Sequence, residues 1–110
     1  MSSKISDLLL TYFQSYNQKD VKNLETLLSK EVALTDWENE ISGRDSVLEL
    51  ASKTFSSFPL LQIEIKNVFV AEYNACAEIC VRLNEKTSLN VVDVFDIKND
   101  KITQIRAYRK

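Results

Sequence analysis

The sequence predicts an α+β fold, with helices in the first part of the chain and an antiparallel sheet in the second. Two observations predict it. Apolar residues recur at helical spacing before Pro59, the only proline, and at every second position after it. The polar residues 98–101 also separate two alternating segments, as the turn of a β-hairpin does. Helices followed by hairpin-connected strands are the element order of an α+β domain.

Three helices and one short strand are expected before Pro59. An apolar stripe from Ile5 to Tyr16 predicts the first helix. After a polar break Asp20 can cap a second helix, and Gly43 marks the break before a third helix that Pro59 ends. The expected elements are helices over about residues 4–17 and 21–28, a strand over residues 32–35, a polar turn over residues 38–40, and a third helix between Gly43 and Pro59.

Alternation of apolar and polar side chains predicts the strands of the sheet. It runs through residues 61–66, 75–83, 89–97 and 102–108. The polar residues 84–87 can connect the second of these strands to the third, because an asparagine tolerates a turn conformation. One face of each strand is therefore expected to be buried.

Asp93 is the polar member of a row that is otherwise apolar. Strand parity places it on the same face as the four large apolar side chains at odd positions of the segment 89–97. Loss of water raises the pKa of a carboxyl group that has no partner, and a protonated carboxyl can donate a hydrogen bond. The alternative is a structural ion pair with Arg82 or Arg106 on a neighbouring strand.

Tyr12 and Asp36 are two further polar groups expected to point inward. Tyr12 lies in the middle of the first apolar stripe, where its hydroxyl needs either a cavity or a hydrogen bond to a neighbouring strand. Asp36 follows the short strand, and directing a carboxylate inward is costly unless a partner or a chemical role accounts for it. Asp36 also begins a polar run that continues through Glu40. The alternative is therefore that Asp36 is a turn residue without a chemical role.

Charge and hydropathy narrow the range of partners. We expect the 110 residues to form one domain over residues 1–110, with 14 basic and 16 acidic side chains and a net charge of −2. Because no basic run stands out, nucleic acid is not an expected partner. No segment approaches the roughly 20 apolar residues of a membrane span, so we expect no membrane association and a cytoplasmic location.

The residue types that are missing or scarce exclude several chemistries. The chain has no histidine, two cysteines and one glycine. A Ser-His-Asp or Cys-His mechanism is therefore excluded, and so is a zinc site of the usual composition. A single glycine excludes a glycine-rich phosphate loop. We expect neither a metal nor an organic cofactor.

The order of these elements and several separated residues resemble the nuclear-transport-factor-2-like superfamily, and within it the SnoaL-like and ketosteroid-isomerase-like branch. The resemblance implies a cone-shaped, curved antiparallel sheet wrapped around three helices of the N-terminal half, a cystatin-like roll with a conical pocket that is often part of a homodimer. The residues that carry it are Tyr12 in the first helix, the Asn17-x-x-Asp20 junction, Asp36 after the first strand, the Gly43 break, and a final hairpin with the segment 91–95, Lys101-Ile102 and Arg106-Ala107.

The resemblance also implies catalytic roles for three residues. Tyr12 and Asp93 match the tyrosine and the neutral aspartic acid that donate hydrogen bonds to an enolate oxygen, and Asp36 matches the aspartate that shuttles the proton. Trp37 departs from the pattern, because the isomerases have a small residue or proline after that aspartate, so Trp37 either lines or blocks the pocket. The expected lining residues are Tyr16, Trp37, Phe55, Val91, Phe95, Arg106 and Tyr108.

Two functions follow as alternatives. The first is a cofactor-independent isomerase, lyase or cyclase that moves a proton next to the carbonyl of a small apolar ligand. The second is a ligand-binding or protein-interaction module of the same fold without catalysis. In both we expect a homodimer formed through the sheet face that carries Cys76, Cys80, Val92 and Val94.

Overall fold

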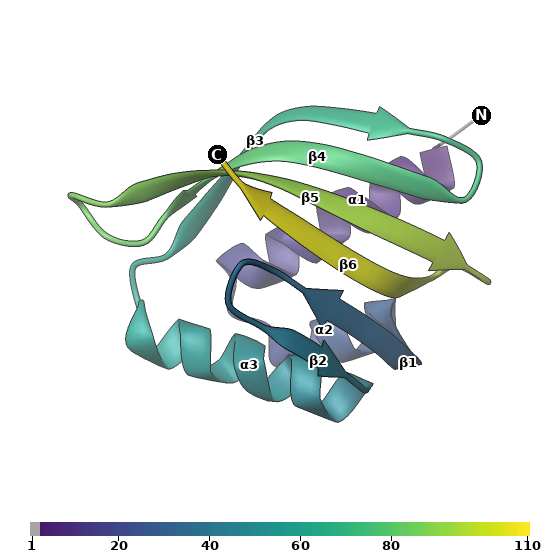
Figure 1. Cartoon of the computed structure of the whole chain (residues 1–110), viewed down its shortest axis with the longest axis horizontal. Coiled ribbons are helices and arrows are strands. Elements are labelled where there is room, and N and C mark those ends of the chain that lie inside the picture. Colours follow the sequence, from purple (N-terminus) through teal and green to yellow (C-terminus); the bar gives the residue numbers. More distant parts are fainter. Residues whose placement is uncertain (1–2) are drawn as a thin grey trace.

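The computed structural model describes residues 3–110 and confirms the predicted α+β fold (Figure 1). Helices and strands occur in nearly the expected order, with one additional short strand. The helices are α1 (Ser3–Asn17), α2 (Val21–Leu27) and α3 (Arg44–Ser57), and the strands are β1 (Leu28–Thr35), β2 (Glu40–Ser42), β3 (Gln62–Val70), β4 (Asn74–Arg82), β5 (Ser88–Lys98) and β6 (Lys101–Arg109).

The strands form one open, curved sheet of six strands in the order β2-β1-β6-β5-β4-β3 (Figure 1). Its pairs are antiparallel as predicted, except that β1 runs parallel to β6. The sheet is therefore mixed, which corrects the expectation of a purely antiparallel one. Neighbours in a parallel pair need a long connection, and here the chain between β1 and β6 contains α3 and four strands.

All three helices lie on the inner side of the curved sheet, and the core fills the space between (Figure 1). Side chains from α1, α2 and the inner faces of the strands meet there. Phe13 packs edge-on against Phe95 of β5, with ring centroids 5.9 Å apart. The most deeply buried side chains include Leu9, Phe13, Leu24, Leu28, Val32, Phe95 and Ile102.

The junction between α1 and α2 is built from local signals in the sequence. Lys19 has a positive φ of 57°, and the amide of Asp20 donates to the carbonyl of Ser15 over 2.8 Å, which closes α1 with a left-handed cap. Asp20 then caps α2 as predicted, because its carboxylate accepts from the amide of Asn23 over 3.0 Å. The second helix ends at Leu27, and Leu28 already starts β1, one residue earlier than predicted for the helix end.

The strand β2 was not predicted from the sequence. It has only three residues and pairs with the end of β1, where Thr35 faces Glu40. Three residues are too few for an alternating pattern to be recognised. Gly43 follows β2 and precedes α3 with a φ of +96°, a conformation that L side chains rarely adopt, so the expected break at this glycine is confirmed.

The last hairpin turns as predicted, but an extra residue shifts the register of its second strand. Asn99 and Asp100 both have positive φ, 53° and 63°, as in a two-residue type I′ turn. Ile97 pairs with Ile102, whereas Asp96 pairs with Gln104, so the bulge in β6 holds one unpaired residue between these partners. Beyond the bulge every side chain of β6 points to the face opposite to the one that simple alternation from Ile102 predicts.

Within residues 3–110, no helix is both long enough and apolar enough to cross a bilayer.

Candidate functional site

A cavity of about 630 Å³ lies between the helices and the inner face of the sheet. Its size falls within the roughly 300–1,000 Å³ that is usual for small-molecule sites. Most of the wall is apolar and comes from five strands and α3. The apolar lining includes Leu34, Leu50, Ile63, Ile79, Val81, Leu89, Val91 and Ile105, and the polar groups on it are Tyr12, Tyr16, Asp36, Glu38, Asn39, Thr54, Thr87, Asp93 and Arg109.

The structure brings Tyr12, Asp36 and Asp93 to this one cavity, although they come from α1, the end of β1 and β5. Tyr12 is 5% exposed and its ring lies between those of Phe13 and Phe95, each at a centroid distance of 5.3 Å. These edge-on contacts hold the ring in place and leave the hydroxyl end toward the cavity wall.

Asp93 is buried, with 8% of its surface exposed, and it does not form the ion pair that we considered as an alternative. Arg106 instead binds Asp96, with Nη1 and Oδ2 2.9 Å apart, and Arg82 lies 3.6 Å from Glu64. Among residues 3–110, no side chain or backbone amide donates a hydrogen bond to the Asp93 carboxyl group. The group is a desolvated acid facing the cavity.

The pKa values of the site follow from this burial. Loss of water, followed by repulsion from the Asp36 carboxylate, raises the pKa of Asp93 to about 7. Burial also raises the pKa of Tyr12, and it raises that of Tyr16 to about 12 with a contribution from Asp93. Near neutral pH both phenols are therefore neutral donors, and Asp93 exchanges between its protonated and ionised forms.

Asp36 is a turn residue and also lines the cavity. Its Oδ1 accepts from the backbone amides of Glu38 and Asn39 over 2.8 and 2.7 Å and from the Asn39 side chain over 3.1 Å. Its Oδ2 has one longer contact, 3.2 Å to the same side-chain nitrogen. The turn thus holds the carboxylate through Oδ1 and leaves acceptor capacity on Oδ2, where a proton can be taken up.

Trp37, Tyr16 and Val91 line the cavity, as the sequence led us to expect. Trp37 is 42% exposed, so its ring forms part of the rim and does not fill the interior. Phe55 and Phe95 do not line the cavity, which corrects the prediction for these two residues; they lie in the layer behind its wall. Phe55 packs edge-on against Tyr16 at 5.0 Å, and Phe95 supports Tyr12 from within the core.

Arg106 and Tyr108 do not line the cavity, which corrects the prediction for both. They lie on the outer face of the sheet, where Arg106 binds Asp96 and Tyr108 is 56% exposed. The prediction counted alternation from Ile102 through the strand, whereas the bulge in β6 inverts the faces after it.

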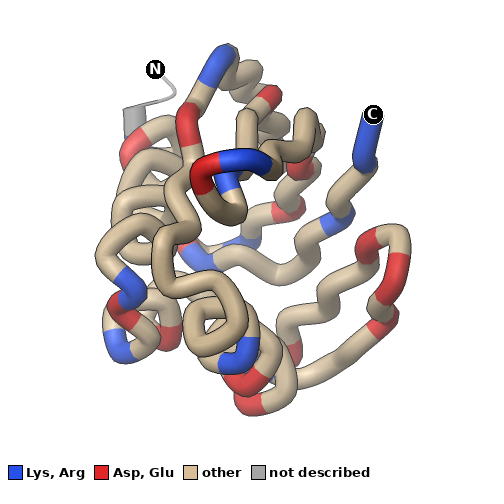
Figure 2. Tube along the Cα trace, turned by 90° about the vertical axis from the view of Figure 1, so that its left-hand side faces the viewer, with Lys and Arg blue, Asp and Glu red and all other residues tan. Residues whose placement is uncertain are grey.

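The residue that sequence reasoning missed is Arg109. Beyond the bulge, Ile105, Ala107 and Arg109 all face the cavity. The guanidinium carbon of Arg109 lies 6.0 Å from the centre of the Trp37 ring, and the two side chains stand together at the rim. The basic end of the chain that contains Arg109 is seen in Figure 2. The signal in the sequence is the apolar residue Ile105, from which alternation leads to Arg109.

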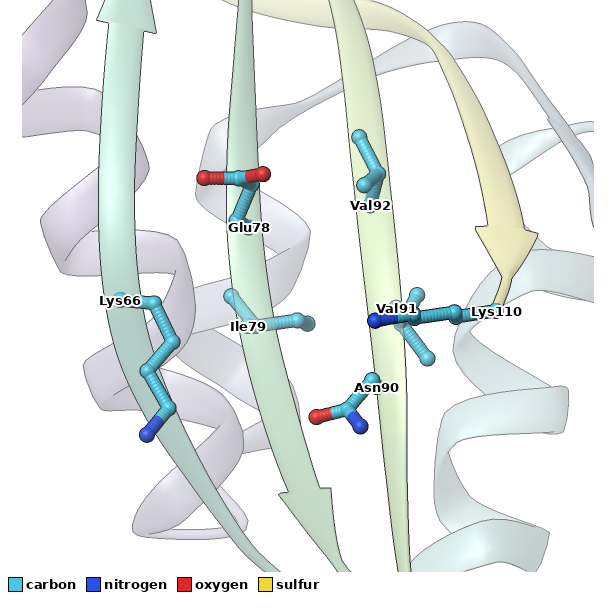
Figure 3. Close-up of a pocket in the computed structure, with 7 residues that line it drawn as sticks. All are labelled: Lys66, Glu78, Ile79, Asn90, Val91, Val92 and Lys110. Atoms are coloured by element: carbon cyan, nitrogen blue, oxygen red, sulfur yellow. The ribbon is translucent and has the colours of Figure 1, made fainter.

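The outer face of the sheet carries a depression of about 310 Å³ (Figure 3). Lys66, Glu78, Asn90 and Val92 project from it, while Ile79 and Val91 point to the inner side and also line the cavity. Within residues 3–110, no group of three or more cysteine or acidic side chains is close enough together to hold a metal ion.

Several solved structures superpose closely on this fold. A nuclear-transport-factor-2-like protein of unknown function from Mesorhizobium loti does so with a TM-score of 0.88 at 17% identity, over 99% of this chain and 93% of that one. A proposed SnoaL-like polyketide cyclase from Jannaschia has a TM-score of 0.88 at 13% identity, over 99% of this chain and 87% of that one. A proposed ketosteroid isomerase from Kribbella flavida has a TM-score of 0.87 at 15% identity, over 99% and 79%.

At these identities the likeness shows the fold that the proteins share. A comparison with curated proteins finds no match. The model of the SnoaL-like domain family matches residues 9–105, which is most of the chain. The curved sheet, the helices on its inner side and this family match lead to one conclusion: the chain belongs to the SnoaL-like domain family.

Proposed function

We propose that the cavity binds a small, mainly apolar carbonyl compound and catalyses proton transfer at the carbon next to the carbonyl. The observation that supports this most is the meeting of Tyr12, Asp36 and Asp93 at one apolar cavity, where no residue of the described chain pairs with the Asp93 carboxyl group. A buried acid without a partner is expensive to keep in a fold. A substrate oxygen that accepts its proton in a hydrogen bond would account for it.

Each group has a distinct role in the proposed reaction. Oδ2 of Asp36 removes a proton from the carbon beside the carbonyl, and the electron pair moves to the carbonyl oxygen to form an enolate. Tyr12 and protonated Asp93 donate hydrogen bonds to that oxygen as its charge develops. In a substrate with a β,γ double bond the enolate is a dienolate, and Asp36 returns the proton to its γ-carbon. The carbonyl re-forms, the carbon–carbon double bond moves into conjugation with it, and no other reactant is needed.

A change of Asp36→Asn tests the base. The isomerisation of cyclohex-3-enone to its conjugated isomer can be followed by ultraviolet absorbance. We expect the variant to lose about 100-fold or more of the rate, because the amide cannot accept the proton, while its remaining oxygen still binds the turn amides. Glu25→Gln removes an exposed charge on α2 and should leave the rate unchanged. Equal rates for the parent and Asp36→Asn would overturn the assignment of the base.

The titration of Asp93 tests the donor. Carboxyl-resolved NMR should give a pKa near 7 for Asp93, and a lower value in Asp36→Asn because a repelling charge is gone. The reaction rate should then fall as the pH rises above 7, where Asp93 loses its proton. A pKa at or below the ordinary value of about 3.9 would mean that Asp93 is ionised at neutral pH and cannot donate.

A binding module without turnover is the second candidate, and one observation favours it. Three hydrogen bonds hold Oδ1 of Asp36 in its turn, so the carboxylate already has a structural role that requires no substrate. This function predicts that a carbonyl ligand binds and is released unchanged, with the same affinity for the parent and for Asp36→Asn.

A further inference from the structure

We propose that the ligand of this cavity carries a carboxylate at the end opposite its carbonyl, and that Arg109 determines this specificity at the rim. The inference deepens the proposed function, on which the placement of the carbonyl rests. It assigns a substrate class to the site and a role to a residue that the reaction itself does not use.

Arg109 is the only lysine or arginine among the described residues that line the cavity. It extends the inward row of Ile105 and Ala107, so strand parity directs it toward the cavity and away from the outer face. The other charged groups on the lining are Asp36, Glu38 and Asp93. A single cation at a fixed position in the rim offers one point of attachment for an anionic group.

The guanidinium of Arg109 is not occupied by a protein carboxylate. Within residues 3–110, the ion pairs that form within 4.0 Å involve other side chains, and none joins Arg109 to Glu38 or Asp36. Arg109 lies over the face of Trp37 instead. This leaves the planar fork of the guanidinium free for a carboxylate, which it can bind through two parallel hydrogen bonds.

The register of the last two strands gives the length of the ligand. Asp93 pairs with Ala107, and Val91 pairs with Arg109. Arg109 therefore lies two residues away from the position of Asp93 along the strand direction. At about 3.4 Å for each residue, this separation is roughly 7 Å. A carbonyl held near Asp93 and Tyr12 therefore places the other end of a molecule the size of one aromatic ring at Arg109 and Trp37.

The acidic groups of the lining do not prevent an anion from binding at the rim. Oδ1 of Asp36 is engaged by three donors of its turn, and Asp93 lies deep in the cavity. Glu38 is exposed, so water screens its charge. The opposite outcome would be that these acids favour a cationic ligand over an anionic one. The experiment described next distinguishes these two preferences.

The test compares three ligands of one shape. 4-Acetylbenzoate carries a ketone and a carboxylate at opposite ends of a ring, 4-acetylbenzamide replaces the carboxylate with a neutral amide, and 4-acetylbenzylamine replaces it with a cation. Calorimetric titration at low ionic strength should show the benzoate binding about tenfold more tightly than the amide, as expected for charged hydrogen bonds at a partly exposed site. The benzylamine should bind most weakly.

Variants assign the preference to Arg109. In Arg109→Gln the benzoate and the amide should bind equally tightly. Arg109→Lys should keep part of the preference for the benzoate, because lysine keeps the positive charge but lacks the two parallel N–H donors of the guanidinium. Arg82→Gln is the matched control, because it removes the same charge from the outer face and should keep the full tenfold preference. An undiminished preference in Arg109→Gln, equal binding of acid and amide to the parent, or tighter binding of the benzylamine would each overturn the inference.

The outcomes distinguish this inference from the proposed function. If the benzoate is preferred through Arg109 but no carbonyl compound is isomerised, the specificity stands and the catalysis fails. If Asp36→Asn abolishes turnover of a neutral ketone and Arg109→Gln changes no affinity, the catalysis stands and the specificity fails.

Discussion

Asp93 is the residue on which the chemistry of the cavity depends. Its carboxyl group is buried on the inner face of β5 without a partner among residues 3–110, and burial raises its pKa to about 7. Burial of this carboxyl group therefore costs least free energy when the group is protonated. Asp93, which we propose as a hydrogen-bond donor to the ligand, should therefore also make the stability of the ligand-free protein depend on pH.

The change Asp93→Asn should remove that dependence. Below about pH 4 the carboxyl is protonated in both the folded and the unfolded chain, so it costs nothing. As the pH rises from about 4 to 7, the unfolded chain loses this proton first, and the free energy of unfolding falls by up to about 1.4 kcal/mol per pH unit from this group. The loss is complete once the pH passes the folded pKa of about 7.

Urea unfolding at several pH values between 4 and 8 measures this effect. The stability difference between Asp93→Asn and the parent should grow by a few kcal/mol in favour of the variant across that range, because the amide never ionises. Carboxyl groups that do not interact with Asp93 titrate in the same way in both proteins, so their contributions cancel. Asp7→Asn, at an exposed position of α1, should show no such growth. Stability curves for Asp93→Asn and the parent that stay parallel would show that Asp93 ionises normally.

At the scale of elements, one side chain joins the end of α1 to the edge strand β3. The side chain of Asn17 accepts from the backbone amide of Ile63 over 2.6 Å and donates to the carbonyl of the same residue over 3.0 Å. It thus pairs with β3 as a neighbouring strand would, and it covers part of an open sheet edge. Lys19 adds a bond from its Nζ to the carbonyl of Leu61 over 3.0 Å. These contacts position α1, and with it Tyr12, against the sheet.

Asn17→Ala should lower the free energy of unfolding by about 2 kcal/mol, because two hydrogen bonds are lost and their backbone partners remain. Asn17→Asp keeps an acceptor and loses the donor, so we expect an intermediate loss. Gln14→Ala, one turn earlier on the exposed side of α1, should change stability by less than about 0.5 kcal/mol. The measurement is urea unfolding, and an equal effect of Asn17→Ala and Gln14→Ala would contradict the role of the junction.

At the scale of the whole molecule, the outer face of the sheet is the large surface that no helix covers (Figure 1). The register aligns Phe69, Cys76 and Val94 across three strands, and Val92 lies beside Tyr108. Phe69 is 55% exposed, and both cysteines on this face are free thiols. An exposed apolar patch of this kind is typical of an interaction surface.

We therefore predict a homodimer through this outer face. Val94→Glu places a charge in the middle of the patch and should shift the protein from dimer to monomer in sedimentation equilibrium at micromolar concentration. Ser56→Glu adds the same charge at an exposed position of α3 and should leave the dimer intact. A parent protein that sediments as a monomer throughout this concentration range would show that the prediction is wrong.

Local patterns in the chain were enough to predict most elements and two of the site's side chains. Tyr12 and Asp93 were placed inward from helical and strand periodicity alone, and both lie on the cavity. Periodicity succeeds here because α1 and β5 are long and regular, so each side chain's direction follows from its neighbours. It could not show that Asp93 lacks an arginine partner, because that depends on which strand pairs with which.

The sequence by itself determined the helices, the four long strands, the two-residue turn at Asn99 and Asp100, and the inward positions of Tyr12 and Asp93, because each rests on steric preferences of neighbouring residues. Only the tertiary structure decided that β1 runs parallel to β6, that Arg106 turns outward to Asp96, and that Arg109 reaches the rim. The parallel pairing joins two strands that are far apart in the sequence, so no local pattern records it. The directions of Arg106 and Arg109 follow from the bulge in β6, because an extra residue is recognised only against the partner strand and reverses the direction of every side chain that follows.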